Sequence, residues 1–108
     1  MNSNATSSCI FCKIVMGEIP SKQEYHDEHC VVFHDIHPKA PVHVLVVPRK
    51  HIPTVMDLKE GDEKIMGHLV RVAKEMGEKL GLEGYRLQFN VGEKGGQEVM
   101  HVHLHLLG

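Results

Sequence analysis

The sequence ends in a segment that alternates between histidine and apolar residues, H-V-H-L-H-L-L over residues 101–107. Alternation of this kind is typical of a β-strand whose two faces meet different environments. Because successive side chains on a strand point to opposite faces, His101, His103 and His105 would form a row on one face, about 7 Å apart. The valine and leucines between them would face a hydrophobic core.

Three interpretations of this row follow from the residues alone: the polar face of a half-exposed strand, a metal site, or a catalytic row. One ion shared by all three histidines is disfavoured. The Cα atoms of His101 and His105 would lie about 13 Å apart, whereas a histidine–zinc bond is about 2 Å long. We favour a catalytic row, because imidazole titrates near neutral pH and acts as nucleophile, acid or base.

The chain has 108 residues, of which ten are histidines, and a formal net charge of −2. This length corresponds to one domain with a modest core, which leaves room for an obligate partner subunit. The lack of a basic field argues against a nucleic-acid partner. No apolar run is long enough to cross a membrane, so no membrane partner is expected.

Residues 1–8 are small and polar and do not form a signal peptide. We expect them to be a disordered tail in front of a single domain at residues 9–108. Three cysteines, an odd number, do not suit a disulfide framework. A reducing setting fits best, cytoplasmic or, in a eukaryote, also nuclear.

The remaining pattern indicates strands separated by one long helix. Strands are expected at residues 23–26, 30–34, 43–47, 85–91 and 101–107, a short helical turn at 9–17, and a long helix from about 62 to 80. In the long helix, apolar residues recur at spacings of three and four, and the stripe is broad enough to cover a sheet with some surface left for a partner. The pattern favours an α+β fold with an antiparallel sheet.

Two further motifs carry chemistry. Cys9 and Cys12 form a C-x-x-C pair, which binds zinc together with two histidines such as His51, or is redox-active, or binds nothing. Cys30 lies within a predicted strand and is expected to be a buried apolar filler. The glycine-rich segment 92–97 is either a plain hairpin loop or a phosphate-binding loop that leads into the histidine row.

Several blocks of the sequence, in order, resemble the histidine triad (HIT) family. They are C-I-F-C-K-I at residues 9–14, E-I-P at 18–20, F-H-D-I at 33–36, P-V-H at 41–43, V-P-R-K-H at 47–51, N-V-G at 90–92, G-G-Q at 95–97 and the histidine strand. The resemblance covers nearly the whole chain, and the nucleotide-binding, purine nucleoside phosphoramidase branch is the most similar. It implies a five-stranded antiparallel sheet with one long and one short helix, paired into a symmetric homodimer.

The resemblance also implies roles for individual residues. His103 would be the nucleophile, and His105 would bind a phosphate oxygen and protonate the leaving amine. The other histidines of the catalytic group would be His101 and His43. The nucleotide would be bound at the phosphate by Asn90, Gln97 and the backbone of Val99, at the ribose by Asp35, and at the base by Ile10, Phe11, Phe33, His34 and Ile36. A structural zinc ion would be held by Cys9, Cys12, His51 and His101.

The implied activity is hydrolysis of the P–N bond of purine nucleoside 5′-phosphoramidates through a nucleotidyl-histidine intermediate. The attacking His103 must be unprotonated while His105 gains from a proton, so we expect neighbouring groups to split their pKa values and the pH–rate profile to be bell-shaped. Alternatives are a nucleotide-binding adaptor without turnover, a zinc hydrolase that uses the histidine row as its metal site, and a dinucleoside polyphosphate hydrolase of the same family.

Two positions depart from the branch. Glu98 stands where some members have serine, and a carboxylate beside a phosphate is unfavourable unless it points away or pairs with a cation, so Glu98 is given no phosphate contact. The sequence stops at Gly108, directly after the triad, whereas a tail follows in the branch. Because of this difference, the resemblance does not fix the substrate selectivity of this chain.

Overall fold

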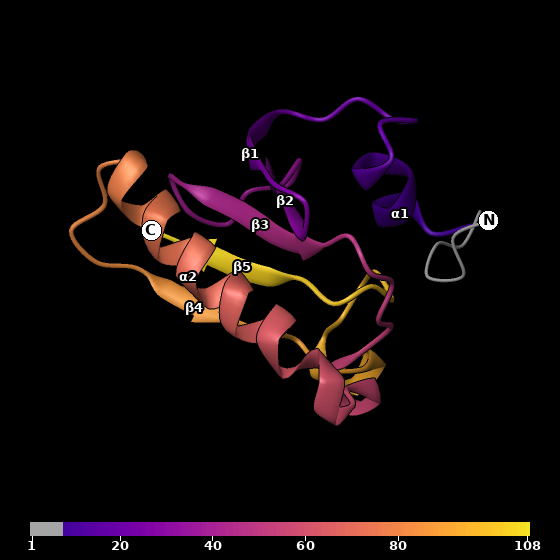
Figure 1. Ribbon diagram of the computed structural model, residues 1–108. Coiled ribbons are helices and arrows are strands. Elements are labelled where there is room, and N and C mark those ends of the chain that lie inside the picture. Colours follow the sequence, from indigo (N-terminus) through magenta and orange to yellow (C-terminus); the bar gives the residue numbers. More distant parts are fainter. Residues whose placement is uncertain (1–7) are drawn as a thin grey trace.

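The computed structural model describes residues 8–108, and the tail expected at residues 1–8 lies outside this range except for Ser8. Five strands form one antiparallel sheet in the order β1-β2-β3-β5-β4, with helix α2 lying along one face (Figure 1). The strands are β1 Gln23–His26, β2 Cys30–His34, β3 His43–Pro48, β4 Arg86–Gln88 and β5 Leu104–Leu107, and the helices are α1 Ile10–Val15 and α2 Glu63–Lys79. The predicted α+β class and the sheet are therefore confirmed.

The two faces of the sheet carry two separate cores. On one face, α2 packs its buried residues Leu69, Val72, Ala73 and Met76 against alternate side chains of β2, β3 and β5. On the other face, the short helix α1 packs Phe11, Ile14 and Val15 against the intervening side chains of β2 and β3. The apolar stripe predicted for the long helix is thus largely buried, although the apolar side chain of Val70 on this helix is 46% exposed.

The histidine strand is shorter than its sequence pattern predicts. Regular pairing begins only at Leu104, where β5 meets Val46 of β3. The preceding residues are extended but bond elsewhere, because the Val102 N–H donates to the carbonyl of Ile52. The alternation predicted for this segment survives within β5, where Leu104 and Leu106 enter the core under α2.

Two other strand ends also differ from expectation. The strand expected at residues 85–91 is regular only over Arg86–Gln88, because the chain then turns into the glycine-rich loop, where the Asn90 side chain donates to the Gly95 carbonyl. Pro48 was expected to stop its strand but is the last residue of β3, where it pairs with Cys30. A missing N–H is tolerated at a strand end.

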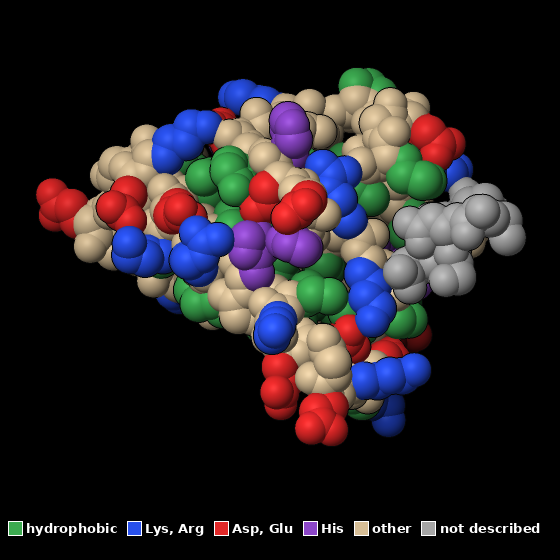
Figure 2. Space-filling view, in the orientation of Figure 1, with side chains coloured by type: hydrophobic (Ala, Val, Ile, Leu, Met, Phe, Trp, Pro, Cys, Tyr) green, Lys and Arg blue, Asp and Glu red, His purple; other side chains and the backbone are tan. Residues whose placement is uncertain are grey.

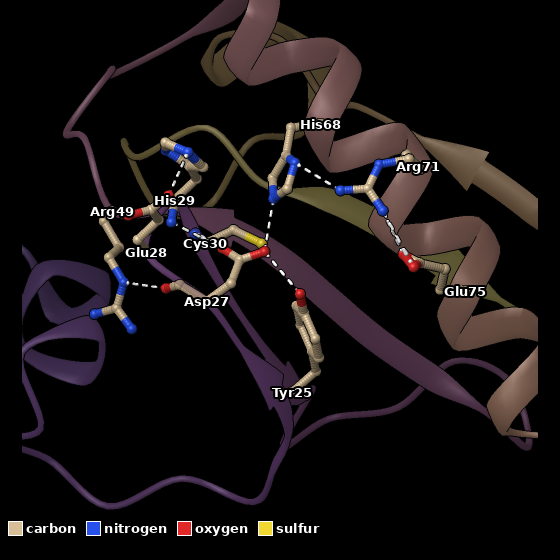
Figure 3. Close-up of polar contacts among 9 residues, drawn as sticks. All are labelled: Tyr25, Asp27, Glu28, His29, Cys30, Arg49, His68, Arg71 and Glu75. Atoms are coloured by element: carbon tan, nitrogen blue, oxygen red, sulfur yellow. Dashed lines mark hydrogen bonds and ion pairs between the residues drawn. The ribbon is translucent and has the colours of Figure 1, made fainter.

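The half-buried carboxylate of Asp27 fastens the turn between β1 and β2 to α2 (Figure 3). One oxygen of Asp27 accepts from the N–H groups of His29 and Cys30, and the other accepts from the Tyr25 hydroxyl at 2.8 Å and from Nε2–H of His68 on α2 at 2.7 Å. Burial alone would raise the pKa of Asp27, but these hydrogen bonds outweigh it and hold the pKa well below its usual range. Oxygen, nitrogen and sulfur donors of Asp27, His68 and Cys30 lie within 4.8 Å of one another, yet both carboxylate oxygens are occupied, so the cluster is a structural tie.

Arg49 extends this tie to the other face of the sheet. Its Nε–H donates to the Asp27 carbonyl at 2.7 Å, and its guanidinium also donates to the carbonyl of Val15 at the end of α1. Arg49 follows β3 directly. Arg49 therefore holds the short helix α1 against the sheet at the C-terminal end of β3.

The outer face of α2 carries charges of both signs, and histidine side chains gather near the centre of the view in Figure 2. Arg71 and Glu75, and likewise Lys74 and Glu78, form ion pairs one helical turn apart. Pairs of this kind stabilise an exposed helix by about 0.3–0.5 kcal/mol each. Within residues 8–108, the helices are too short or too polar to pass through a lipid bilayer.

Candidate functional site

A pocket of about 680 Å³ opens on the face of the sheet that carries α1. Its floor includes His103 and His105, and its sides come from α1, from the loop after β2 and from the glycine-rich loop. The strand register explains the floor: Leu45, His105 and Gln88 lie side by side on β3, β5 and β4, and all three line the pocket. The sheet thus presents imidazole groups at the bottom of an otherwise mainly apolar cavity.

The predicted base-binding residues lie together in this pocket. Ile10, Phe11, Phe33, His34 and Ile36 all line it. The rings of Phe11 and Phe33 meet edge to face with centroids 5.4 Å apart, whereas Ile36 is 85% exposed at the rim. An exposed isoleucine beside a cavity offers apolar surface to a flat ligand such as a nucleobase.

The hydrogen bonds of His103 determine which of its nitrogens is free. Nδ1–H donates to the carbonyl of His101 at 2.7 Å. In the neutral imidazole the other nitrogen, Nε2, then carries the lone pair. The ring is 7% exposed and packs edge to face against Phe11, so its orientation is locked from two sides.

A chain of hydrogen bonds likewise sets the tautomer of His105. The backbone N–H of Lys39 donates to Nδ1 of His43, which leaves the proton of that ring on Nε2. Nε2–H of His43 therefore donates to Nδ1 of His105 at 2.9 Å. The proton of the neutral His105 ring is consequently on Nε2, next to His103, whose ring centroid is 4.9 Å away.

Burial keeps these imidazoles neutral in the free protein. It lowers the pKa of His103 and of His43, and together with the neighbouring imidazoles of His103 and His43 it lowers the pKa of His105 to about 4. The expected split, with His105 charged and His103 neutral, is therefore not a property of the free chain. An anion in the pocket would oppose the effect of burial, since a nearby negative charge favours the protonated form of histidine.

Asp35 lies between the histidine relay and the mouth of the pocket. One of its oxygens accepts from the backbone N–H of His37, and the other lies 3.5 Å from Nε2 of His43. Asp35, His43 and His105 bring donor atoms within 4.8 Å of one another. The hydrogen bond from His43 to His105 already uses two of these atoms, so a metal ion there would have to break the relay.

The glycine-rich loop does not form the phosphate cradle considered for residues 92–97. Gly92 and Gly96 have φ values of +72° and +85°, which suit glycine, and they fold the loop back on itself. The N–H groups of Gly95, Gly96 and Gln97 bond to carbonyls at the start of the loop, and that of Gly92 bonds to the Gln97 side chain. These four donors are therefore not free to bind an anion.

The three residues predicted to bind the phosphate, Asn90, Gln97 and Val99, do not all line the pocket. Gln97 is buried outside the pocket lining, and its amide group donates to the carbonyls of Pro53 and Val99. Asn90 and Val99 do line the pocket, and the N–H of Val99 makes no hydrogen bond among residues 8–108. A phosphate contact of Gln97 stays a prediction, while its visible role is to hold the loop.

The four predicted zinc ligands converge beside the pocket. Cys9, Cys12, His51 and His101 offer one donor atom each within 4.8 Å. The sulfur of Cys12 lies 3.2 Å from Nδ1 of His51 and 3.5 Å from Nδ1 of His101, and the two nitrogens are 3.2 Å apart. A tetrahedral zinc ion with its usual bond lengths requires about 3.6 Å between sulfur and nitrogen and about 3.3 Å between two nitrogens.

The second nitrogen of His101 supports the same donor set. Nε2–H donates to the carbonyl of Pro48 at 2.8 Å, which leaves the lone pair on Nδ1, the atom that faces the cysteines. Burial lowers the pKa of His101 to about 4, so the ring is neutral, as a ligand must be. The cluster could therefore hold a metal ion. His101 belongs to this cluster, whereas His103 and His105 line the pocket.

Sequence reasoning missed four groups that the fold places at the site. The N–H of Lys39 sets the tautomer of His43, Leu45 and Gln88 line the pocket floor, and the Pro48 carbonyl orients His101. Leu45 could have been found from the strand pattern, because it lies two residues after His43 on the same face. The two backbone groups carry no sequence signal.

Comparisons with known proteins agree with this geometry. The model of the family described as "Scavenger mRNA decapping enzyme C-term binding" matches residues 8–108. A HIT family hydrolase from Legionella pneumophila Philadelphia 1 is 47% identical with a TM-score of 0.92, and covers 94% of this chain and 92% of its own. The chain belongs to the histidine triad family.

Two further relatives of this HIT protein support the assignment. A histidine triad protein from Clostridium difficile is 41% identical with a TM-score of 0.92, and the match covers 94% of this chain and 90% of that one. The purine nucleoside phosphoramidase of Escherichia coli (strain K12) is 46% identical over 101 residues, which cover 92% of this chain and 85% of that protein. The resemblance inferred from the sequence blocks is confirmed.

Proposed function

We propose that this HIT protein hydrolyses the P–N bond of purine nucleoside 5′-phosphoramidates. The observation that carries the proposal is the pairing of two tautomers: His103 with a lone pair on Nε2, and His105 beside it with a proton on Nε2. One ring can attack phosphorus while the other donates a proton. The 46% identity to a purine nucleoside phosphoramidase supports this choice of substrate.

In the proposed first step, Nε2 of His103 attacks the α-phosphorus and forms a P–N bond to the enzyme. The bond from phosphorus to the substrate amine breaks, and the departing amine takes a proton from His105. Because the bound phosphate raises the pKa of His105, that ring enters the step with a second proton and leaves it neutral. The second proton lies on Nδ1, so His105 gives up the hydrogen bond from Nε2–H of His43 in this state, and Nε2–H of His105 is the donor to the amine.

In the second step, water attacks the phosphorus of the nucleotidyl-histidine. The water proton passes to Nε2 of His105, the bond to His103 breaks, and the nucleoside monophosphate is released. His105 ends the cycle with the proton that it had at the start. The ring of His103, held by Phe11 and by the His101 carbonyl, returns to its attacking tautomer without reorientation.

The remaining pocket residues are proposed to bind the nucleoside. Asp35, at the mouth, would accept hydrogen bonds from the ribose hydroxyls, and the N–H of Val99 and the amide of Asn90 would contact the phosphate. The base would lie on the apolar side chains of Phe11, Phe33 and Ile36. The protonated His105 ring and the N–H groups directed at the phosphate would stabilise its charge in a site from which water is excluded.

We also propose a structural zinc ion at Cys9, Cys12, His51 and His101. Zinc there supplies a cross-link and no chemical step. It would hold the His101 backbone, whose carbonyl accepts the hydrogen bond from Nδ1–H of His103. Cys9, Cys12 and Cys30 are free thiols, which supports a reducing, cytoplasmic location for the protein.

A symmetric homodimer is proposed from the unpaired edge of the sheet. β4 is an edge strand, and the exposed face of α2 beside it carries Val70, while Leu87 of β4 is 40% exposed. Leu87 pairs with Leu106, so it lies on the α2 side of the sheet.

Light scattering should give a mass near twice that of the chain, and Leu87→Glu should shift it toward the monomer. A monomeric unaltered chain would refute the dimer.

The deciding experiment is hydrolysis of adenosine 5′-phosphoramidate by the purified chain, by His103→Ala and by His26→Ala. His26 is an exposed histidine outside the pocket and serves as the matched control. Release of AMP by the unaltered chain and by His26→Ala, but not by His103→Ala, is expected. AMP binding without turnover by the unaltered chain would instead indicate a nucleotide-binding adaptor, and preferential cleavage of dinucleoside polyphosphates would indicate the other enzyme class.

A further inference from the structure

Glu98 lies where the nucleotide pocket meets a second, smaller cavity. The second cavity measures about 460 Å³ and is lined by Ser8, Cys9, Ile10, His51, Glu98, Val99 and Met100. It shares Ile10, Glu98 and Val99 with the main pocket, so the two spaces are adjoining. Glu98 is the single carboxylate in this lining, and neither lysine nor arginine contributes to it.

The Glu98 carboxylate is free to act on a ligand. Its side chain is exposed and forms no ion pair or hydrogen bond with residues 8–108. Glu98 nevertheless lines the same pocket as His103 and His105. A carboxylate in the pocket lining that has no partner among residues 8–108 leaves a cation to be supplied by the substrate.

The geometry of the reaction places the leaving group toward Glu98. In-line displacement puts the departing group on the side of phosphorus opposite the attacking Nε2. His103 lies on the buried floor, so the amine departs toward the open side, where Glu98 and Met100 are exposed. The second cavity then receives whatever substituent the amine carries, on the apolar side chains of Ile10, Val99 and Met100.

We infer that Glu98 selects phosphoramidates whose leaving amine carries a second, positively charged group on a short apolar stem. This inference rests on the proposed phosphoramidase activity and names its substrate class. A carboxylate at this point attracts a cationic leaving group and repels an anionic one such as a polyphosphate. Exposed ion pairs contribute about 0.2–1 kcal/mol, so the expected preference is about two- to fivefold in kcat/KM.

The test uses two adenosine 5′-phosphoramidates with leaving groups of the same shape. One is substituted on nitrogen with 2-(trimethylammonio)ethyl, and the other with 3,3-dimethylbutyl, in which carbon replaces the charged nitrogen. The charge also changes the basicity of the leaving amine. The diagnostic quantity is therefore the ratio of the two kcat/KM values compared between the unaltered chain and Glu98→Gln.

We expect Glu98→Gln to lower the ratio of cationic to neutral substrate about two- to fivefold, and added salt to lower it in the unaltered chain. Glu93→Gln, which removes a carboxylate from the same loop outside both cavities, should leave the ratio unchanged. An unaltered ratio in Glu98→Gln, or an equal loss with both substrates, would overturn the inference. If the unaltered chain hydrolyses neither substrate, the inference is overturned, and hydrolysis of the parent adenosine 5′-phosphoramidate decides separately whether the proposed function fails as well.

Discussion

Gly77, in the second half of α2, allows a direct test of how this helix packs on the chain that follows it. A Cβ added at this position would meet the ring of Tyr85, with Cζ only 2.8 Å away. Gly67, ten residues earlier in the same helix, has no atom within 4 Å of the added Cβ. The same substitution, glycine to alanine, should therefore have opposite effects at the two positions.

The magnitudes follow from two opposing contributions. Alanine in a helix interior is more favourable than glycine by about 0.8–1 kcal/mol. Forcing a methyl group into an occupied site costs about 1–3 kcal/mol. We expect Gly67→Ala to raise the free energy of unfolding by about 0.8–1 kcal/mol and Gly77→Ala, where the packing cost opposes the same gain, to lower it by up to about 2 kcal/mol. The helix-propensity contribution cancels in the comparison, so the difference of about 2 kcal/mol measures the contact with Tyr85.

The assay is urea unfolding of both variants at one protein concentration and one zinc content, because subunit association and metal binding both shift apparent stability. Replacing Tyr85 with leucine should remove most of the penalty of Gly77→Ala. Stabilisation of equal size at both positions would refute the reasoning, because it would mean that the Tyr85 ring does not pack over Gly77.

Two further predictions concern the tie at Asp27 and the metal site. Asp27→Asn should lower the free energy of unfolding by about 1.5–3 kcal/mol near neutral pH, since it weakens charge-assisted hydrogen bonds. Folding depresses the pKa of Asp27, so its stabilisation is present above the unfolded pKa of about 3.9 and is lost as pH falls through the folded value. Urea titrations from pH 7 to pH 3 should therefore show the gap between the two proteins closing below about pH 4, and a constant gap would contradict the assignment. Cys12→Ser should abolish bound zinc measured by plasma mass spectrometry, whereas Cys30→Ala should retain it; zinc that survives the first substitution would move the metal to another donor set.

Much of the site was predictable because short sequence patterns, each of a few residues, indicate it. The alternation of residues 101–107 predicted that His103 and His105 share a face, and the pocket lining confirms it. The C-x-x-C pair and the ordered family blocks indicated which distant residues would meet. The sequence left the glycine-rich loop open between a plain hairpin loop and a phosphate-binding loop, and in the structure four of its N–H groups bond within the loop.

The sequence by itself determined the element types and their faces, because backbone periodicity and side-chain polarity act over a few neighbouring residues. Only the tertiary structure decided which nitrogen of each histidine bears the proton. The tautomer of His103 depends on the carbonyl of His101, and that of His105 depends on His43, which lies 62 positions away in the chain. A proton on an imidazole follows whichever acceptor or donor the fold brings within 3 Å, and no sequence pattern records that distance.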